Sequence, residues 1–110
     1  PLSADRRPPT ADRCLAFCAL GNPNNFFDQL RQENFDLIST RAFPDHHFYT
    51  ARDIADLTEK ARKDGAEIFL TTAKDAVKLK NLDFKMPCLV VETEMFFDEE
   101  FNIYLKSERS

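Results

Sequence analysis

Residues 14–20 form an unbroken apolar run that ends abruptly at Gly21-Asn22-Pro23. A run of this length without polar alternation is typical of a strand that is buried on both faces of a sheet. Asn22 is a good helix N-cap, and Pro23 suits the first position of a helix. The sequence therefore predicts a buried strand followed at once by a helix, which we expect to extend to about Gln32.

The alternation of strand and helix continues along the chain. Thr50 and Thr72 are each followed three residues later by an aspartate, and this capping-box spacing predicts a helix start at both threonines. Gly65 is expected to end the first of these two helices. Further strands are predicted over residues 35–43, 67–71 and 88–94, and a last helix is predicted to begin at Asp98 and to carry Phe101, Tyr104 and Leu105.

Strands that alternate with helices at this spacing imply right-handed crossovers and parallel pairing. We therefore expect an α/β fold, a Rossmann-like three-layer α/β/α sandwich with a mostly parallel sheet of about four strands. A chain of 110 residues with 43% hydrophobic content and eleven phenylalanines can build one core. Residues 14–110 are expected to form this domain, and the proline- and arginine-rich residues 1–13 a linker or arm toward an upstream segment.

Charge and composition disfavour several classes of function. A net charge of −4 gives no general attraction to nucleic acid, so no nucleic-acid partner is expected. No apolar stretch approaches the roughly 20 residues of a membrane span, and the N-terminus lacks the layout of a signal peptide. Three cysteines, an odd number, favour the reducing cytoplasm over secretion.

The parallel topology predicts where a ligand binds. All parallel strands end at the same edge of a sheet, and ligands bind in the crevice at that edge. Three polar loops should meet there: residues 21–23, residues 43–47 and residues 71–75. The candidate site is therefore expected among these loops.

The second loop holds both histidines of the chain beside a carboxylate, in Asp45-His46-His47. Histidine suits proton transfer near neutral pH, and a neighbouring carboxylate can orient it. On an extended segment, Asp45 and His47 would share one face while His46 points to the other. The alternative is a solvated loop with a local turn. Metal ligation is disfavoured, because adjacent histidines lack the usual spacing of zinc ligands.

The other two loops allow both a structural and a functional interpretation. Gly21 and Asn22 suit a turn and a helix cap, although the helix start could also receive a phosphate; a single glycine is not a P-loop. Asp75 has the spacing of a cap partner for Thr72. Lys74 lies in the first turn of its helix, where a cation opposes the helix dipole, and a bound anion would offset that cost.

Three ordered segments resemble one known family: residues 16–23 with Phe26-Phe27, residues 40–50, and residues 71–79. They resemble the C-terminal part of the tetraacyldisaccharide 4′-kinases, the lipid A 4′-kinases of Gram-negative bacteria. The resemblance covers only the smaller of the two domains of that enzyme.

The resemblance implies ATP-dependent phosphorylation of the 4′-hydroxyl of the tetraacyldisaccharide 1-phosphate precursor, at the cytoplasmic face of the inner membrane. The P-loop, the magnesium-binding acids and the membrane-facing helix of the family belong to the N-terminal domain. ATP and Mg²⁺ would thus be bound mainly by that domain, and membrane contact would be made only through it. The present chain alone would be inactive.

Asp45 and His46 match the Asp-His pair that, in the family, reaches across the domain cleft toward a catalytic aspartate on the N-terminal domain. His46 would then support the base rather than be the base. Candidate contacts to the nucleotide or the facing domain are Gly21, Asn22, His47, Thr72, Lys74 and Asp75. The chain departs from the family pattern at Ala73, where many relatives have Glu, and at Ala19-Leu20-Gly21, where they have Gly-Ile-Gly.

Two alternatives remain open from the sequence. The sequence Asp45-His46-His47 also resembles the Asp-His-His motif of the manganese-dependent phosphoesterases of the DHH family, in which the motif helps to hold a two-metal site. Those enzymes carry further acidic motifs and a glycine-rich histidine segment, and this sequence has neither. The second alternative is a noncatalytic binding module that keeps the α/β fold.

Overall fold

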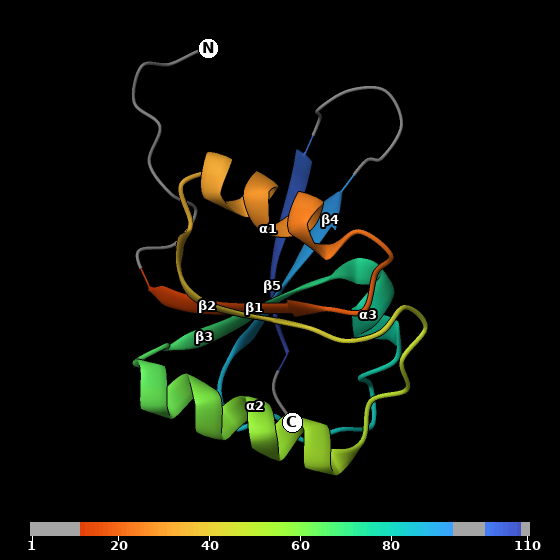
Figure 1. Cartoon of the computed structure of the whole chain (residues 1–110). Helices are drawn as coiled ribbons and strands as arrows, with labels where there is room; N and C mark the ends of the chain where they lie inside the picture. Colours follow the sequence, from red (N-terminus) through yellow and green to blue (C-terminus); the bar gives the residue numbers. More distant parts are fainter. Residues whose placement is uncertain (1–11, 94–100, 109–110) are drawn as a thin grey trace.

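The computed structural model describes residues 12–93 and 101–108, with side-chain surroundings through Val91. The chain alternates strands and helices, as the sequence predicts (Figure 1). The elements are β1 (Arg13–Cys18), α1 (Pro23–Gln32), β2 (Asp36–Ala42), α2 (Ala51–Asp64), β3 (Ile68–Thr72), α3 (Ala73–Val77), β4 (Cys88–Thr93) and β5 (Phe101–Glu108).

The strands form one sheet in the order β2-β1-β3-β4-β5. Strands β1 to β4 pair in parallel, whereas β5 pairs with β4 in the antiparallel direction. Helices α1 and α2 cover opposite faces of the sheet, and α3 lies at the end toward which β1 points (Figure 1). The expectation of an α/β sandwich with a mostly parallel sheet is confirmed.

The interior strand β1, which lies between β2 and β3, is buried on both faces, and this explains its unbroken apolar sequence. Its side chains alternate between two cores because successive residues of a strand point to opposite faces. Leu15 and Phe17 pack in the core that includes Ile54 and Leu57 of α2. Cys14, Ala16 and Cys18 pack in the core that includes Phe26, Phe27 and Leu30 of α1.

The free cysteines Cys14, Cys18 and Cys88 are buried. Burial raises the pKa of the Cys14 and Cys18 thiols to about 12. At neutral pH these thiols are protonated, so they fill the core rather than act as nucleophiles.

Helix α2 begins and ends where the sequence predicts. The hydroxyl of Thr50 accepts a hydrogen bond from the backbone N–H of Asp53 at 3.1 Å, and the carboxylate of Asp53 accepts one from the backbone N–H of Thr50 at 3.0 Å. This is a complete capping box. Gly65 ends the helix in the left-handed conformation with φ of 88°, which favours glycine.

The prediction of a last helix is wrong, because residues 101–108 form strand β5. Phe101, Tyr104 and Leu105 fit a helical spacing, but the segment is rich in aromatic and β-branched residues that favour strands. Strand β4 offers unpaired backbone groups at its edge, and β5 pairs with them in the register Val91 to Ile103 and Val90 to Tyr104. The expected cap Asp98 lies outside the described residues.

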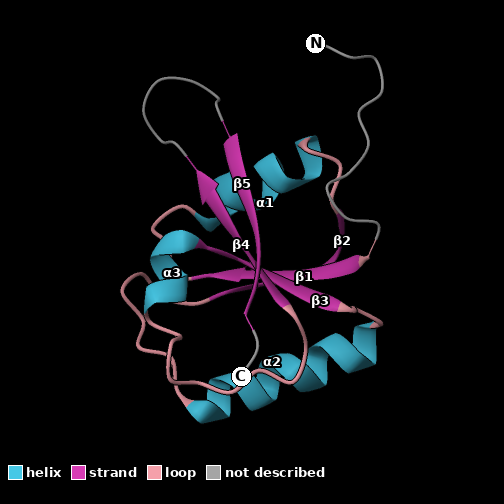
Figure 2. Cartoon of the chain, turned by 180° about the vertical axis from the view of Figure 1, so that it is seen from behind, coloured by secondary structure: helices cyan, strands magenta, loops and turns pink. Residues whose placement is uncertain are grey.

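The loops that carry the predicted site gather at one end of the sheet, beside α3 (Figure 2). This end holds the carboxyl ends of β1, β2 and β3, as parallel pairing requires. None of the helices among the described residues has the length and apolar content needed to cross a membrane.

Candidate functional site

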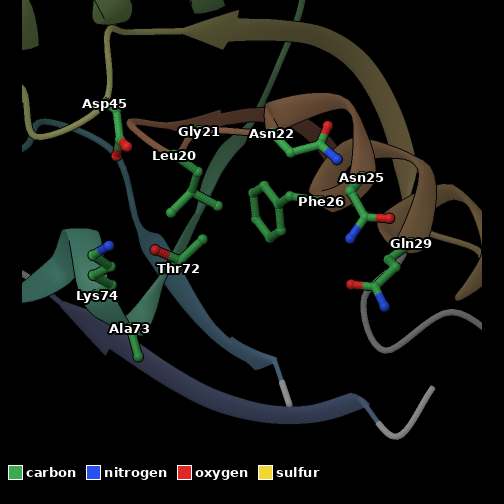
Figure 3. Close-up of a pocket in the computed structure, with 10 residues that line it drawn as sticks. All are labelled: Leu20, Gly21, Asn22, Asn25, Phe26, Gln29, Asp45, Thr72, Ala73 and Lys74. Atoms are coloured by element: carbon green, nitrogen blue, oxygen red, sulfur yellow. The ribbon is translucent and has the colours of Figure 1, made fainter. Parts of the chain in front are cut away.

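A pocket of about 520 Å³ lies at the carboxyl edge of the sheet. The three loops that the topology brings together all contribute to it, together with one side of α1. In Figure 3, Asp45 and Lys74 lie at one end of the opening, and the amide side chains of Asn22, Asn25 and Gln29 lie at the other. The lining residues are Leu20, Gly21, Asn22, Asn25, Phe26, Gln29, Asp45, Thr72, Ala73 and Lys74.

Five residues that the sequence singled out therefore line one pocket: Gly21, Asn22, Asp45, Thr72 and Lys74. The sequence interpretation missed Leu20, Asn25, Phe26 and Gln29. A signal for the amides was present, because Asn22, Asn25 and Gln29 follow the i, i+3, i+7 spacing that places side chains on one side of a helix.

Asn22 occupies the N-cap position of α1, as predicted, but its side chain makes no capping hydrogen bond. An N-cap asparagine normally accepts a hydrogen bond from the first turn of the helix. Here the amide lines the pocket instead. Asn22 is thus available to a ligand while Pro23 begins the helix at its first position.

Gly21 leaves room for the carboxylate of Asp45. A Cβ atom at position 21 would lie 3.4 Å from Asp45 Oδ2, at the limit of ordinary contact. The loop after β1 and the loop after β2 thus touch at the pocket wall. A larger side chain at position 21 would displace the Asp45 carboxylate.

Asp45 and His46 occupy the centre of a tight turn, which the backbone N–H of His47 closes by donating to the carbonyl of Pro44 at 3.0 Å. His46 has φ of 66°, in the left-handed region where a turn normally carries glycine or asparagine. Its Nε2 lies 3.8 Å from Asp45 Oδ2, and its side chain is 77% exposed. The turn therefore presents the imidazole to solvent beside the pocket.

The expectation that Asp45 and His47 share a face is wrong. It assumed an extended segment, whereas the turn directs His47 toward α2. His47 Nε2 donates to Asp53 Oδ2 at 2.8 Å, and the ring stacks on Phe43 with centroids 4.7 Å apart. His47 does not line the pocket. It attaches the turn to the start of α2.

Asp75 is 1% exposed and lies behind the pocket lining. Its Oδ1 accepts hydrogen bonds from the backbone N–H of Ala19 at 3.1 Å and from the Tyr49 hydroxyl at 3.0 Å. Its Oδ2 accepts one from the Thr72 hydroxyl, which in turn accepts from the Asp75 backbone N–H at 3.0 Å. The predicted cap by Thr72 is confirmed, but the Asp75 carboxylate also joins three separate segments.

Tyr49 is a site residue that the sequence interpretation did not single out. Burial, together with the charge and hydrogen bond of Asp75, raises the pKa of the Tyr49 hydroxyl well above its usual range. The hydroxyl therefore stays protonated and donates to Asp75. The sequence around Tyr49 does not indicate this contact, because Tyr49 and Asp75 are 26 residues apart.

The charged groups of the pocket lining are Asp45 and Lys74. Lys74 is exposed, in contrast to Lys78, whose Nζ donates to the carbonyl of His47 at 3.4 Å. Within the part of the chain that the structure describes, no group of three or more His, Cys, Asp or Glu side chains is placed to hold a metal ion. The pocket thus combines one cation, one carboxylate, amides and an apolar floor.

Comparison with known proteins identifies the family. The family model for tetraacyldisaccharide-1-P 4′-kinase (LpxK) matches residues 2–109. A tetraacyldisaccharide 4′-kinase of Gluconobacter oxydans is 44% identical over 85 residues, which cover 77% of this chain and 25% of the relative. That of Methylobacterium radiotolerans is 41% identical over 87 residues, covering 79% of this chain and 26% of the relative.

A third relative, the tetraacyldisaccharide 4′-kinase of Mesorhizobium japonicum, is 38% identical over 89 residues, covering 78% of this chain and 26% of the relative. The chain thus spans about a quarter of the length of the curated relatives it matches. No solved structure matches the chain at a significant level. The match favours the kinase over the phosphoesterase alternative, and it extends over nearly the whole sequence: the chain belongs to the tetraacyldisaccharide-1-P 4′-kinase family.

Proposed function

We propose that this chain is the C-terminal domain of an ATP-dependent kinase that phosphorylates the 4′-hydroxyl of the tetraacyldisaccharide 1-phosphate precursor of lipid A. Family membership and the names of the matched relatives support this activity. In this proposal the whole protein acts at the cytoplasmic face of the inner membrane. The chain supplies one wall of the active-site cleft, and an N-terminal P-loop domain supplies the other.

The exposed Asp45-His46 turn is the observation that carries the proposal. His46 is held with φ of 66°, and its exposed imidazole lies 3.8 Å from the carboxylate of Asp45, which lines the pocket. Backbone conformations of this kind cost free energy and tend to occur at functional sites. An exposed imidazole can reach a carboxylate on a facing domain and help that carboxylate to accept the proton of the sugar hydroxyl.

The pocket residues have proposed roles in binding. Lys74 is the cation of the pocket and suits a phosphate oxygen as a point charge. Gly21 and Asn22 offer a close backbone and an amide toward the same opening, and Thr72 lines it while its hydroxyl is hydrogen-bonded to Asp75. His47 and Asp75 act from behind these groups, because their hydrogen bonds are made to Asp53 and to the surrounding loops.

Magnesium and the triphosphate are assigned mainly to the N-terminal domain. Mg²⁺ requires near-octahedral oxygen coordination, whereas Asp45 is the one carboxylate among the described pocket-lining residues. Bound ATP and Mg²⁺ supply the phosphoryl group and neutralise its charge. The proposed roles of the residues of this chain are to bind and orient the substrates and to hold a proton.

Phosphate transfer by the full-length protein tests this proposal. The protein is incubated with ATP labelled in the γ-phosphate and with the tetraacyldisaccharide 1-phosphate, and the position of the label is determined. We expect the label at the 4′-hydroxyl with the full-length protein and no transfer with residues 1–110 alone. Transfer to another group, or none from the full-length protein, would overturn the proposed reaction. Transfer by residues 1–110 alone would overturn the division between two domains.

A further inference from the structure

The three loops of the candidate site converge on the buried carboxylate of Asp75. The loop after β1 donates through the backbone N–H of Ala19, the loop before α2 through the hydroxyl of Tyr49, and the end of β3 through the hydroxyl of Thr72. Each of these loops carries residues with a proposed role in the site. Asp75 therefore connects the pieces of the site without lining the pocket.

The connection is rigid because the carboxylate is fully enclosed. Asp75 is 1% exposed, Thr72 is 4% exposed and Tyr49 is 8% exposed. A buried polar group that loses its partner is strongly destabilised, so the donors and the carboxylate hold one another in place. Among the described residues, no buried side-chain nitrogen or oxygen lacks a hydrogen-bond partner.

Tyr49 makes the link to the turn that carries His46. Its ring packs edge-on against Phe17 at 5.7 Å and against Phe43 at 5.1 Å between centroids. It also meets the ring of His47 at 5.3 Å. Packing thus fixes the position of the Tyr49 ring. The hydrogen bond of its hydroxyl to Asp75 fixes the distance between the loop of Tyr49 and α3. The contact of Lys78 Nζ with the carbonyl of His47 is a weaker second link.

We propose that Asp75 and Tyr49 are positioning residues. Their hydrogen bond holds the Asp45-His46 turn in register with the loop of Gly21 and with Lys74, so that the domain presents these groups to the facing domain as one unit. This inference rests on the proposed function, because His46 must have a catalytic role for its position to matter.

A double-mutant cycle in the full-length kinase tests the inference. Tyr49→Phe removes the hydroxyl and keeps the ring packing. We expect it to lower kcat about tenfold, with a change of less than about twofold in KM for ATP. Tm should fall as well, because Asp75 Oδ1 then keeps only its hydrogen bond from the backbone N–H of Ala19. In the His46→Ala background, Tyr49→Phe should lower kcat by less than about twofold further, because residues that act through one another are not additive.

Two controls separate positioning from general stability. Ser39→Ala removes another hydroxyl-to-carboxylate hydrogen bond, from Ser39 to Asp64 at 2.8 Å, near the other end of α2. It should leave kcat within about twofold. Thr58→Val removes a buried hydroxyl that donates to the carbonyl of Ile54 at 2.8 Å inside α2, and it should also leave kcat within about twofold.

The outcomes distinguish the inference from the proposed function. If His46→Ala lowers kcat and Tyr49→Phe leaves it unchanged, the positioning role is wrong and the proposed function stands. The positioning role is also wrong if Tyr49→Phe lowers kcat by the same factor in the wild-type protein and in the His46→Ala background. If His46→Ala itself leaves kcat unchanged, the proposed catalytic role of the turn fails, and the positioning role fails with it.

Discussion

His47 Nε2 lies 2.8 Å from Asp53 Oδ2, so a histidine of the candidate site is bonded to the carboxylate that caps α2. One carboxylate thereby fixes the helix start and the turn that carries His46. The arrangement explains why two adjacent histidines have different surroundings: the side chain of His46 is 77% exposed, and that of His47 is 26% exposed. His47 supports the loop, and His46 remains free to meet another group.

The carboxylate of Asp53 predicts a pH-dependent contribution to stability. Partial burial acts to raise its pKa, but the hydrogen bonds from His47 and Thr50 outweigh burial and hold the pKa below the usual 3.8. A folded-state pKa that is depressed contributes stability above the unfolded pKa, and this stability is lost as pH falls through the lower folded value. We expect Asp53→Asn to destabilise the protein by about 1 kcal/mol at pH 6.

Urea unfolding of both proteins at pH 6 and at pH 2.5 measures this effect. The difference in free energy of unfolding between wild type and Asp53→Asn should shrink at the lower pH. Asp56→Asn on the same helix serves as the control, because its exposed pair with Arg52 at 4.0 Å contributes about 0.5 kcal/mol or less. If the loss in free energy of unfolding caused by Asp53→Asn is the same at both pH values, the stabilising role of the ionised Asp53 carboxylate is contradicted.

The left-handed backbone of His46 predicts an unusual order of stabilities at that position. Glycine adopts φ of 66° without cost, whereas other residues lose about 1 kcal/mol there. His46→Gly should therefore be more stable than His46→Ala by about 1 kcal/mol. At Asp56, inside α2, the order should reverse, because alanine favours a helix over glycine by a similar amount. Thermal unfolding of the four variants compares them; the same order at both positions would contradict the turn geometry.

The two glycines of the chain should respond differently to alanine. Gly65 has φ of 88°, so Gly65→Ala should lower the free energy of unfolding by about 1 kcal/mol and leave the kinase rate of the full-length protein unchanged. Gly21→Ala should change stability by less than about 0.5 kcal/mol. The larger Gly21→Val should lower the kinase rate, because a Cβ at this position already lies 3.4 Å from Asp45 Oδ2 and the added methyl groups would displace that carboxylate. A loss of about 1 kcal/mol in the free energy of unfolding for Gly21→Ala, with none for Gly65→Ala, would show that Gly21 rather than Gly65 is required by the fold.

Much of the fold followed from local sequence signals. The unbroken apolar run of β1, the capping box of Thr50 and Asp53, and the stop at Gly65 are each determined by residues close together in the chain. Strand β5 could not be predicted in this way, because its pairing with β4 decides between strand and helix. Parallel topology also predicts that the loops of Gly21, Asp45 and Lys74 meet at one edge of the sheet, and these three residues line one pocket.

The details of the site required the structure. Whether Asp45 faces His46 or His47 depends on the turn conformation at His46, which few sequences with histidine at this position would adopt. The hydrogen bonds of Asp75 to Ala19 and Tyr49 join residues 56 and 26 positions apart, and no local pattern indicates them. Contacts at such separations follow from the folded arrangement of the loops.

The rate of phosphate transfer by the His46→Ala variant of the full-length protein tests the central claim most directly. The variant is compared with wild type and with Asp56→Asn at saturating ATP and lipid substrate, with Tm measured for each protein. A residue that assists proton transfer contributes about 100-fold or more to turnover. We therefore predict a loss of about 100-fold for His46→Ala with little change in Tm, and a rate within about twofold of wild type for Asp56→Asn. A His46→Ala rate within about twofold of wild type would contradict the assignment of the Asp45-His46 turn to catalysis.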